Sequence, residues 1–91
     1  MFDRIAIVKS KYGIHARPSA AICTIAKKYP GTKIVLIDPV SGTTYDTVSI
    51  LEILTINKKE GDSVIVRASG TGEIDAVNAI VLLIETYEVE D

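Results

Sequence analysis

Apolar residues follow two different spacings along this 91-residue chain. Short runs rich in β-branched residues are typical of strands, whereas apolar residues that recur every three or four positions are typical of amphipathic helices. These spacings predict strands over residues 4–9, 33–38, 43–46 and 63–68, and helices over residues 16–29, 49–56 and 73–88. The predicted order of elements is therefore β-α-β-β-α-β-α.

Each predicted helix has one apolar stripe that would face a core. The stripes consist of Ile22, Ile25, Ala26 and Tyr29 in the first helix, of Ile50, Ile53 and Leu54 in the second, and of Ile74, Val77, Val81 and Ile84 in the third. Pro30 and Gly31 should end the first helix. Asn57, a residue type that tolerates left-handed backbone, should end the second.

A hairpin around the turn at residues 38–42 indicates antiparallel pairing rather than a doubly wound parallel sheet. The expected fold class is α+β: a two-layer open-faced sandwich with a four-stranded antiparallel sheet and three helices on one face. We expect one domain over residues 1–91, because a chain of this length supports one hydrophobic core.

Three of the predicted strands carry apolar residues on both faces, although a sheet with one face in water should alternate more cleanly. One interpretation is that a second copy of the chain covers part of the outer sheet face, which would make a homodimer. The alternative is that a small domain simply leaves some apolar surface exposed. The sequence leaves both interpretations open.

Charge and composition argue against several classes of function. The formal net charge of -2 and the low aromatic content argue against nucleic-acid binding. The longest apolar run, residues 79–84, is far too short to span a bilayer, so we expect no direct membrane insertion. Cys23 is the only cysteine, and the N-terminal residues lack the pattern of a signal peptide. We therefore expect a cytoplasmic protein.

The only histidine, His15, falls at the junction between a loop and the first predicted helix. The free N–H groups of Ala16 and Arg17 at a helix start favour an anion, and the Arg17 guanidinium could bind phosphate oxygens. A neutral imidazole has a lone pair for attack on phosphorus, and Gly13 allows the loop to bend closely. The alternative is an ordinary residue at a helix start. We expect no metal site, because a second histidine is lacking.

Residues 13–18, Gly-Ile-His-Ala-Arg-Pro, resemble the active-site motif of the HPr family. These are the histidine-containing phosphocarrier proteins of the bacterial phosphoenolpyruvate-dependent sugar phosphotransferase system. The resemblance extends over nearly the whole chain, including the order of elements and residues 68–70 and 75–79. It implies that enzyme I donates a phosphoryl group to His15 and that an enzyme IIA domain receives it in sugar uptake, with Arg17 assisting. Such a protein is a transiently phosphorylated carrier, not an enzyme, and needs no cofactor.

Ser49 has two interpretations that can hold together. In a capping box, the Ser49 hydroxyl accepts from the N–H of Glu52, and the Glu52 carboxylate reaches back to the N–H of Ser49. The family resemblance adds that Ser49 aligns with the serine that an ATP-dependent HPr kinase/phosphorylase modifies in many bacteria. The alternative function is therefore mainly a regulatory binding module, which binds a transcriptional regulator when Ser49 is phosphorylated.

The resemblance also implies a patch on which partner proteins dock. The matching positions are Ala20, Ile50, Leu51 and Leu54. Helical spacing leaves open whether Ile50 and Leu54 belong to this patch or to the core, but it favours an exposed Leu51 and a buried Ile53. Glu52 stands where many relatives have Gly or Lys. Because relatives often meet acidic partner surfaces, Glu52 could weaken or redirect docking.

Overall fold

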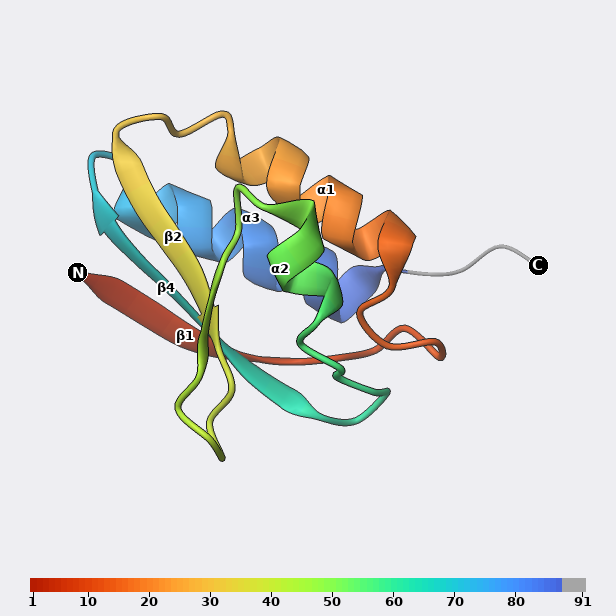
Figure 1. Ribbon diagram of the computed structural model, residues 1–91. Helices are drawn as coiled ribbons and strands as arrows, with labels where there is room; N and C mark the ends of the chain where they lie inside the picture. Colours follow the sequence, from red (N-terminus) through yellow and green to blue (C-terminus); the bar gives the residue numbers. More distant parts are fainter. Residues whose placement is uncertain (88–91) are drawn as a thin grey trace.

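A computed structural model describes residues 1–87 and confirms the predicted order of elements (Figure 1). The strands are β1 (Phe2–Ile7), β2 (Thr32–Ile37), β3 (Thr44–Asp46) and β4 (Ser63–Gly70). The helices are α1 (Ala16–Ala26), α2 (Ile50–Leu54) and α3 (Glu73–Thr86). Within residues 1–87, none of the helices is long and apolar enough to cross a bilayer.

The four strands form one antiparallel sheet in the order β1-β4-β2-β3, which confirms the expected fold class. The last strand in the chain, β4, lies between β1 and β2, and its Ile65 pairs with Ile5 on one side and Ile37 on the other. The hairpin between β2 and β3 turns at Asp38, whose carboxylate accepts from the N–H of Val40 at 2.9 Å. This contact is the turn chemistry that the sequence predicts.

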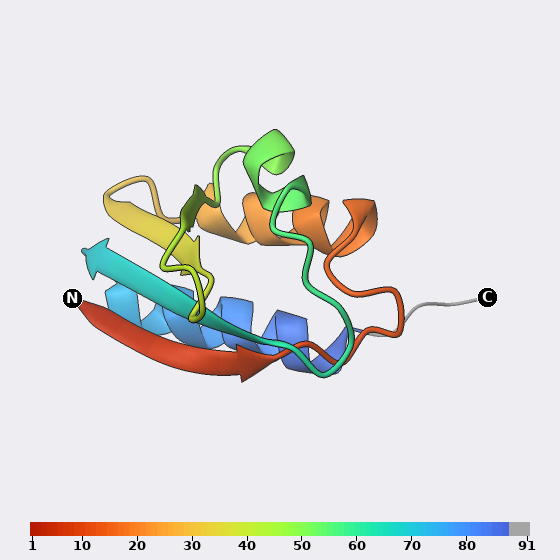
Figure 2. The same cartoon turned by 60° about the horizontal axis from the view of Figure 1, so that its bottom comes forward.

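The helices form the second layer of the sandwich (Figure 2). Helix α3 packs directly against β1 and β4, and α1 packs against both α3 and α2. The core between the layers contains Ala6, Leu36, Val64 and Val66 from the strands and Ile22, Ile53, Val77 and Ile80 from the helices. On the opposite face of the sheet, Ile5 is 61% exposed, so part of the apolar outer face meets solvent.

Each helix is shorter than the periodicity predicts. Helix α1 ends at Ala26 rather than residue 29, because Pro30 disfavours helical backbone at the residue before it. Instead, the N–H groups of Lys28 and Tyr29 donate to carbonyls three residues back. Helix α2 lacks the ends of the predicted range 49–56, and α3 ends at Thr86. The predicted end of the third helix, residue 88, lies outside the described residues.

Two of the predicted apolar stripes are partly wrong. Ile74 is 54% exposed, because the buried stripe of α3 is formed by Ala76, Val77, Ile80, Val81 and Ile84. In α2 only Ile53 is fully buried, whereas Ile50 and Leu54 lie at its sides and are each 40% exposed. Helix α2 therefore buries one residue of the predicted stripe and leaves the other two at the surface.

Candidate functional site

The loop before α1 is fixed by a close backbone contact at Gly13. The N–H of Ile14 donates to the carbonyl oxygen of Lys58 at 3.1 Å, which joins this loop to the loop between α2 and β4. Gly13 has a positive φ of 71° and is buried. A Cβ atom on this residue would overlap the Lys58 carbonyl oxygen and lie 3.1 Å from the Cα atom of Lys59. Glycine is therefore required both by the backbone conformation and by the close approach.

His15 is the N-cap residue of α1, as the sequence predicts. Its backbone is extended, with φ -108° and ψ -163°, and its carbonyl accepts from the N–H of Ser19 at 3.0 Å. The side chain is partly exposed and makes no capping hydrogen bond. Within residues 1–87, no hydrogen bond uses the backbone N–H groups of Ala16 and Arg17. The start of α1 therefore presents an imidazole beside two free N–H donors.

The Arg17 side chain is exposed. Among the described residues it forms neither an ion pair nor a hydrogen bond. Its guanidinium therefore keeps all of its donors for an external anion, two residues after His15 on the same helix start.

Two tyrosine rings lie against the His15 imidazole. The ring centroids of Tyr12 and His15 are 6.0 Å apart, and those of His15 and Tyr87 are 6.2 Å apart, each pair in an edge-on arrangement. Tyr12 belongs to the same loop as His15, but Tyr87 caps the far end of α3. Tyr87 is not among the predicted site residues, because no local signal in the sequence shows that the end of the last helix lies next to the start of the first.

The four positions predicted to dock partner proteins are all exposed to solvent. Leu51 is 78% exposed, against 40% for each of Ile50 and Leu54, and Ala20 on α1 is exposed as well. Helices α1 and α2 pack together, and the thiol of Cys23 donates to the carbonyl of Val48 at 3.5 Å just before α2. We call the exposed residues Ala20, Ile50, Leu51 and Leu54 the docking surface.

Ser49 caps α2 as expected, but the prediction that Glu52 completes the capping box is wrong. The Ser49 hydroxyl accepts from the N–H of Glu52 at 3.3 Å. The Glu52 carboxylate does not return to Ser49; it accepts from the N–H of Asp46 at 3.1 Å. The N–H of Ser49 donates instead to the Asp46 carbonyl at 3.2 Å.

The Asp46 carboxyl is held in its charged form. It pairs with the Lys33 ammonium at 2.9 Å, and it also accepts from the N–H of Val48 at 3.2 Å. The Lys33 hydrogen bond is the largest influence on the pKa of Asp46, and together with the weaker Val48 hydrogen bond it holds this pKa below its ordinary value of 3.8 despite the opposing effect of burial. The segment around Ser49 contains this Asp46 carboxylate and also the carboxylate of Glu52.

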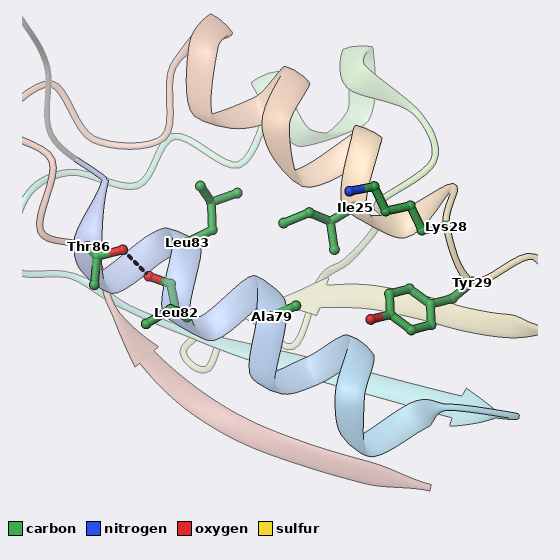
Figure 3. A pocket seen from close by; sticks show the side chains of 7 residues that line it. All are labelled: Ile25, Lys28, Tyr29, Ala79, Leu82, Leu83 and Thr86. Carbon is green, nitrogen blue, oxygen red and sulfur yellow. Dashed lines mark hydrogen bonds between the residues drawn. The ribbon is translucent and has the colours of Figure 1, made fainter.

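A separate apolar groove of about 420 Å³ lies between α1 and α3 (Figure 3). It is lined by Ile25, Lys28, Tyr29, Ala79, Leu82, Leu83 and Thr86. None of the predicted site residues lines this groove.

The chain is similar to known proteins over most of its length. A family model described as PTS HPr component phosphorylation site matches residues 2–86. The phosphocarrier protein HPr of Mycoplasma pneumoniae is 35% identical over 83 residues, which cover 91% of this chain and 92% of that protein. The phosphocarrier protein NPr of Proteus mirabilis is 29% identical over 90 residues, covering 99% and 97%.

Solved structures show the same fold. HPr from Thermoanaerobacter tengcongensis superposes with a TM-score of 0.85 and 30% identity, covering 94% of this chain and 93% of that one. A structure described as an HPr dimer from the same organism gives a TM-score of 0.70, with coverage of 94% and 95%. The fold and these matches together define a non-catalytic carrier protein of the phosphotransferase system. More specifically, the chain belongs to the HPr family.

Proposed function

We propose that His15 accepts a phosphoryl group from one protein and passes it to another. The observation that carries this proposal is the position of a partly exposed imidazole at the N-cap of α1, beside the unused N–H groups of Ala16 and Arg17. A helix N-terminus favours negative charge, and the exposed Arg17 guanidinium can add charge-assisted hydrogen bonds to phosphate oxygens.

The chemistry is a simple exchange of bonds at phosphorus. An imidazole nitrogen forms a bond to phosphorus while the bond to the donor breaks, and the donor keeps that electron pair. The second transfer repeats the step in the opposite sense, with His15 as the leaving group. The protein therefore ends each cycle unchanged but is itself phosphorylated within it, which distinguishes a carrier from a catalyst.

Family membership supports enzyme I as the donor and enzyme IIA domains as acceptors in sugar uptake. These partners would dock over the start of α1 and over α2, where the docking surface offers exposed apolar side chains. Exposed aliphatic residues next to a charged group suit an interface with an apolar centre and a polar rim.

The decisive experiment is incubation of the protein with purified enzyme I and phosphoenolpyruvate, followed by mass spectrometry. We expect one phosphate on His15, labile in acid and stable in base, and none on His15→Ala. Ser49→Ala is the matched control and should accept phosphate normally. A wild-type protein that stays unmodified, or a His15→Ala variant that still accepts phosphate, would contradict the proposal.

We also propose regulation through Ser49, which lies at the edge of the docking surface and is partly exposed. A phosphate there would add about -1.5 to -2 of charge beside the Glu52 carboxylate. The expected result is weaker docking of partners with apolar or acidic surfaces. Incubation with ATP and an HPr kinase/phosphorylase should give an acid-stable phosphate on Ser49; its absence would remove this part of the proposal. Binding of a transcriptional regulator to that form would favour the mainly regulatory alternative.

Three further expectations from the sequence stay predictions: one domain over residues 1–91, a cytoplasmic location and a homodimer. For the homodimer, the exposed Ile5 on the outer sheet face and the dimeric relative from Thermoanaerobacter tengcongensis give support. Sedimentation velocity of Ile5→Lys against the wild type tests it. A wild type that stays monomeric at high concentration would remove the idea.

A further inference from the structure

The groove between α1 and α3 is apolar along most of its length. On α3, the lining positions 79, 82, 83 and 86 follow the spacing of a single helix face. This face meets Ile25 of α1 across the groove, and its Leu82 is 64% exposed. The face from Ala79 to Thr86 extends over about 10.5 Å of helix, at 1.5 Å per residue. The groove can therefore hold an extended aliphatic chain of similar length.

The polar groups of the groove gather at one end. The Tyr29 hydroxyl points into the groove, and the Lys28 ammonium is turned toward Ile25 (Figure 3). Within residues 1–87, neither group forms a hydrogen bond or an ion pair. At the opposite end, the Thr86 hydroxyl is already used, because it donates to the carbonyl of Leu82 at 2.6 Å. Only the end at Lys28 and Tyr29 therefore offers free donors.

The Tyr29 ring is held in position by the start of α3. Its Cδ1 atom would lie only 3.2 Å from a Cβ atom on Gly72, the N-cap residue of α3, so the ring packs directly against this glycine. The N–H of Tyr29 donates to the carbonyl of Ala26 at 3.1 Å, and its own carbonyl accepts from the N–H of Thr32 at 3.0 Å. A donor that is fixed before binding loses little freedom when a ligand arrives.

Charge and shape together indicate the class of ligand that fits. Among the described residues that line the groove, none is acidic, and the Lys28 ammonium makes the end with the free donors positive. A carboxylate accepts hydrogen bonds from both an ammonium and a phenol hydroxyl. The volume of about 420 Å³ lies in the range of small-molecule sites, about 300–1,000 Å³. Because the free donors lie at one end only, the groove fits a molecule with one anionic head and an apolar tail.

We propose that this groove binds a medium-chain aliphatic carboxylate. The carboxylate lies at the Lys28 ammonium and the Tyr29 hydroxyl, and the aliphatic chain lies between Ile25 and the apolar face of α3. This site shares helix α1 with the proposed phosphoryl site, but none of its residues belongs to that site or to the docking surface. The inference is therefore independent of phosphoryl transfer, and it can be tested without enzyme I.

Titration of the ¹⁵N-labelled protein with sodium octanoate, followed through the backbone amide resonances, tests this proposal. We expect saturable shift changes at the amides of the groove and none at the docking surface. The dissociation constant should be on the order of 1 mM, as suits a ligand of this size in an open site. Butanoate should bind at least about tenfold more weakly, because each half-buried methylene group adds about twofold to the affinity.

Four variants separate the head of the ligand from its tail. Lys28→Met and Tyr29→Phe each remove one donor and should weaken octanoate binding about two- to fivefold. Leu82→Glu places a carboxylate beside the apolar tail and should abolish binding. Ile74→Glu is the matched control, because Ile74 is also an exposed apolar residue of α3, at 54%, but lies outside the groove. This control should bind octanoate as the wild type does.

Octylammonium is the control for the head group. The Lys28 ammonium should repel it, so it should bind at least about fivefold more weakly than octanoate. Equal binding of the two ligands, shift changes that fail to saturate, or a Leu82→Glu variant that binds like Ile74→Glu would each overturn the proposal. Shift changes in the groove that follow protein concentration in the absence of octanoate would show that a second copy covers the groove, and would overturn it as well.

Discussion

Replacement of Gly13 by alanine tests the contact that fixes the His15 loop. A non-glycine residue in the left-handed region costs about 1–2 kcal/mol. The added Cβ would also overlap the Lys58 carbonyl oxygen, forcing the two loops apart and breaking the hydrogen bond from Ile14, which is worth about 1 kcal/mol. We therefore expect Gly13→Ala to lower the free energy of unfolding by about 2–3 kcal/mol.

Gly42 provides a matched control for this variant. Its φ of 77° is nearly the same as that of Gly13, but a Cβ atom there would meet nothing within 4 Å. Gly42→Ala should therefore show the backbone effect alone, about 1–2 kcal/mol.

Urea denaturation measures the difference between the two variants. With an m-value of about 1 kcal/mol/M, the midpoint of Gly13→Ala should fall about 1 M below that of Gly42→Ala. Equal midpoints would refute the reasoning, because they would show that the contact with Lys58 adds nothing to the effect of the backbone conformation.

Three further predictions concern capping, packing and pH. Ser49→Ala should lower the free energy of unfolding by about 1 kcal/mol through loss of the α2 cap, measured by thermal denaturation. Ile53→Ala should lower it by about 2–5 kcal/mol, whereas Leu51→Ala should change it by less than about 0.5 kcal/mol and instead slow transfer to an enzyme IIA domain. The pKa of Asp38 is lowered by the N–H of Val40 first and then by Lys58. Its stabilising effect, like that of Asp46, should be complete above the ordinary value of 3.8 and be lost as pH falls below it. Asp38→Asn should flatten that part of the pH profile of stability, and an unchanged profile would contradict this assignment.

The sequence predicts the features of this protein that depend on neighbours along the chain. The order of strands and helices and the left-handed Asn57 (φ 54°) after α2 follow from local signals, and the structure confirms them. The position of His15 at the start of a helix is local in the same sense.

The missed features depend on contacts between distant segments. Tyr87 lies beside His15 only because α3 ends where β1 and the following loop meet, and Gly13 contacts Lys58 from a loop much later in the chain. The predicted buried face of α3 is wrong at Ile74 for a related reason. The choice between Ile74 and Ala76 as a buried residue depends on which side of the helix meets the sheet, and hydrophobicity alone favours the larger side chain.

The order of the strands has a consequence for how the protein is made. Because β4 lies between β1 and β2, these two strands do not pair with each other. Phe2 in β1 can form its backbone pair only once Ala68 in β4 has been synthesised. A nascent chain can form α1 and the β2–β3 hairpin early, but the four-stranded sheet can be completed only after β4 has left the ribosome. Such long-range pairing slows folding relative to helical bundles of the same size. We therefore expect newly made chains to gain protection from proteolysis in one late step rather than gradually.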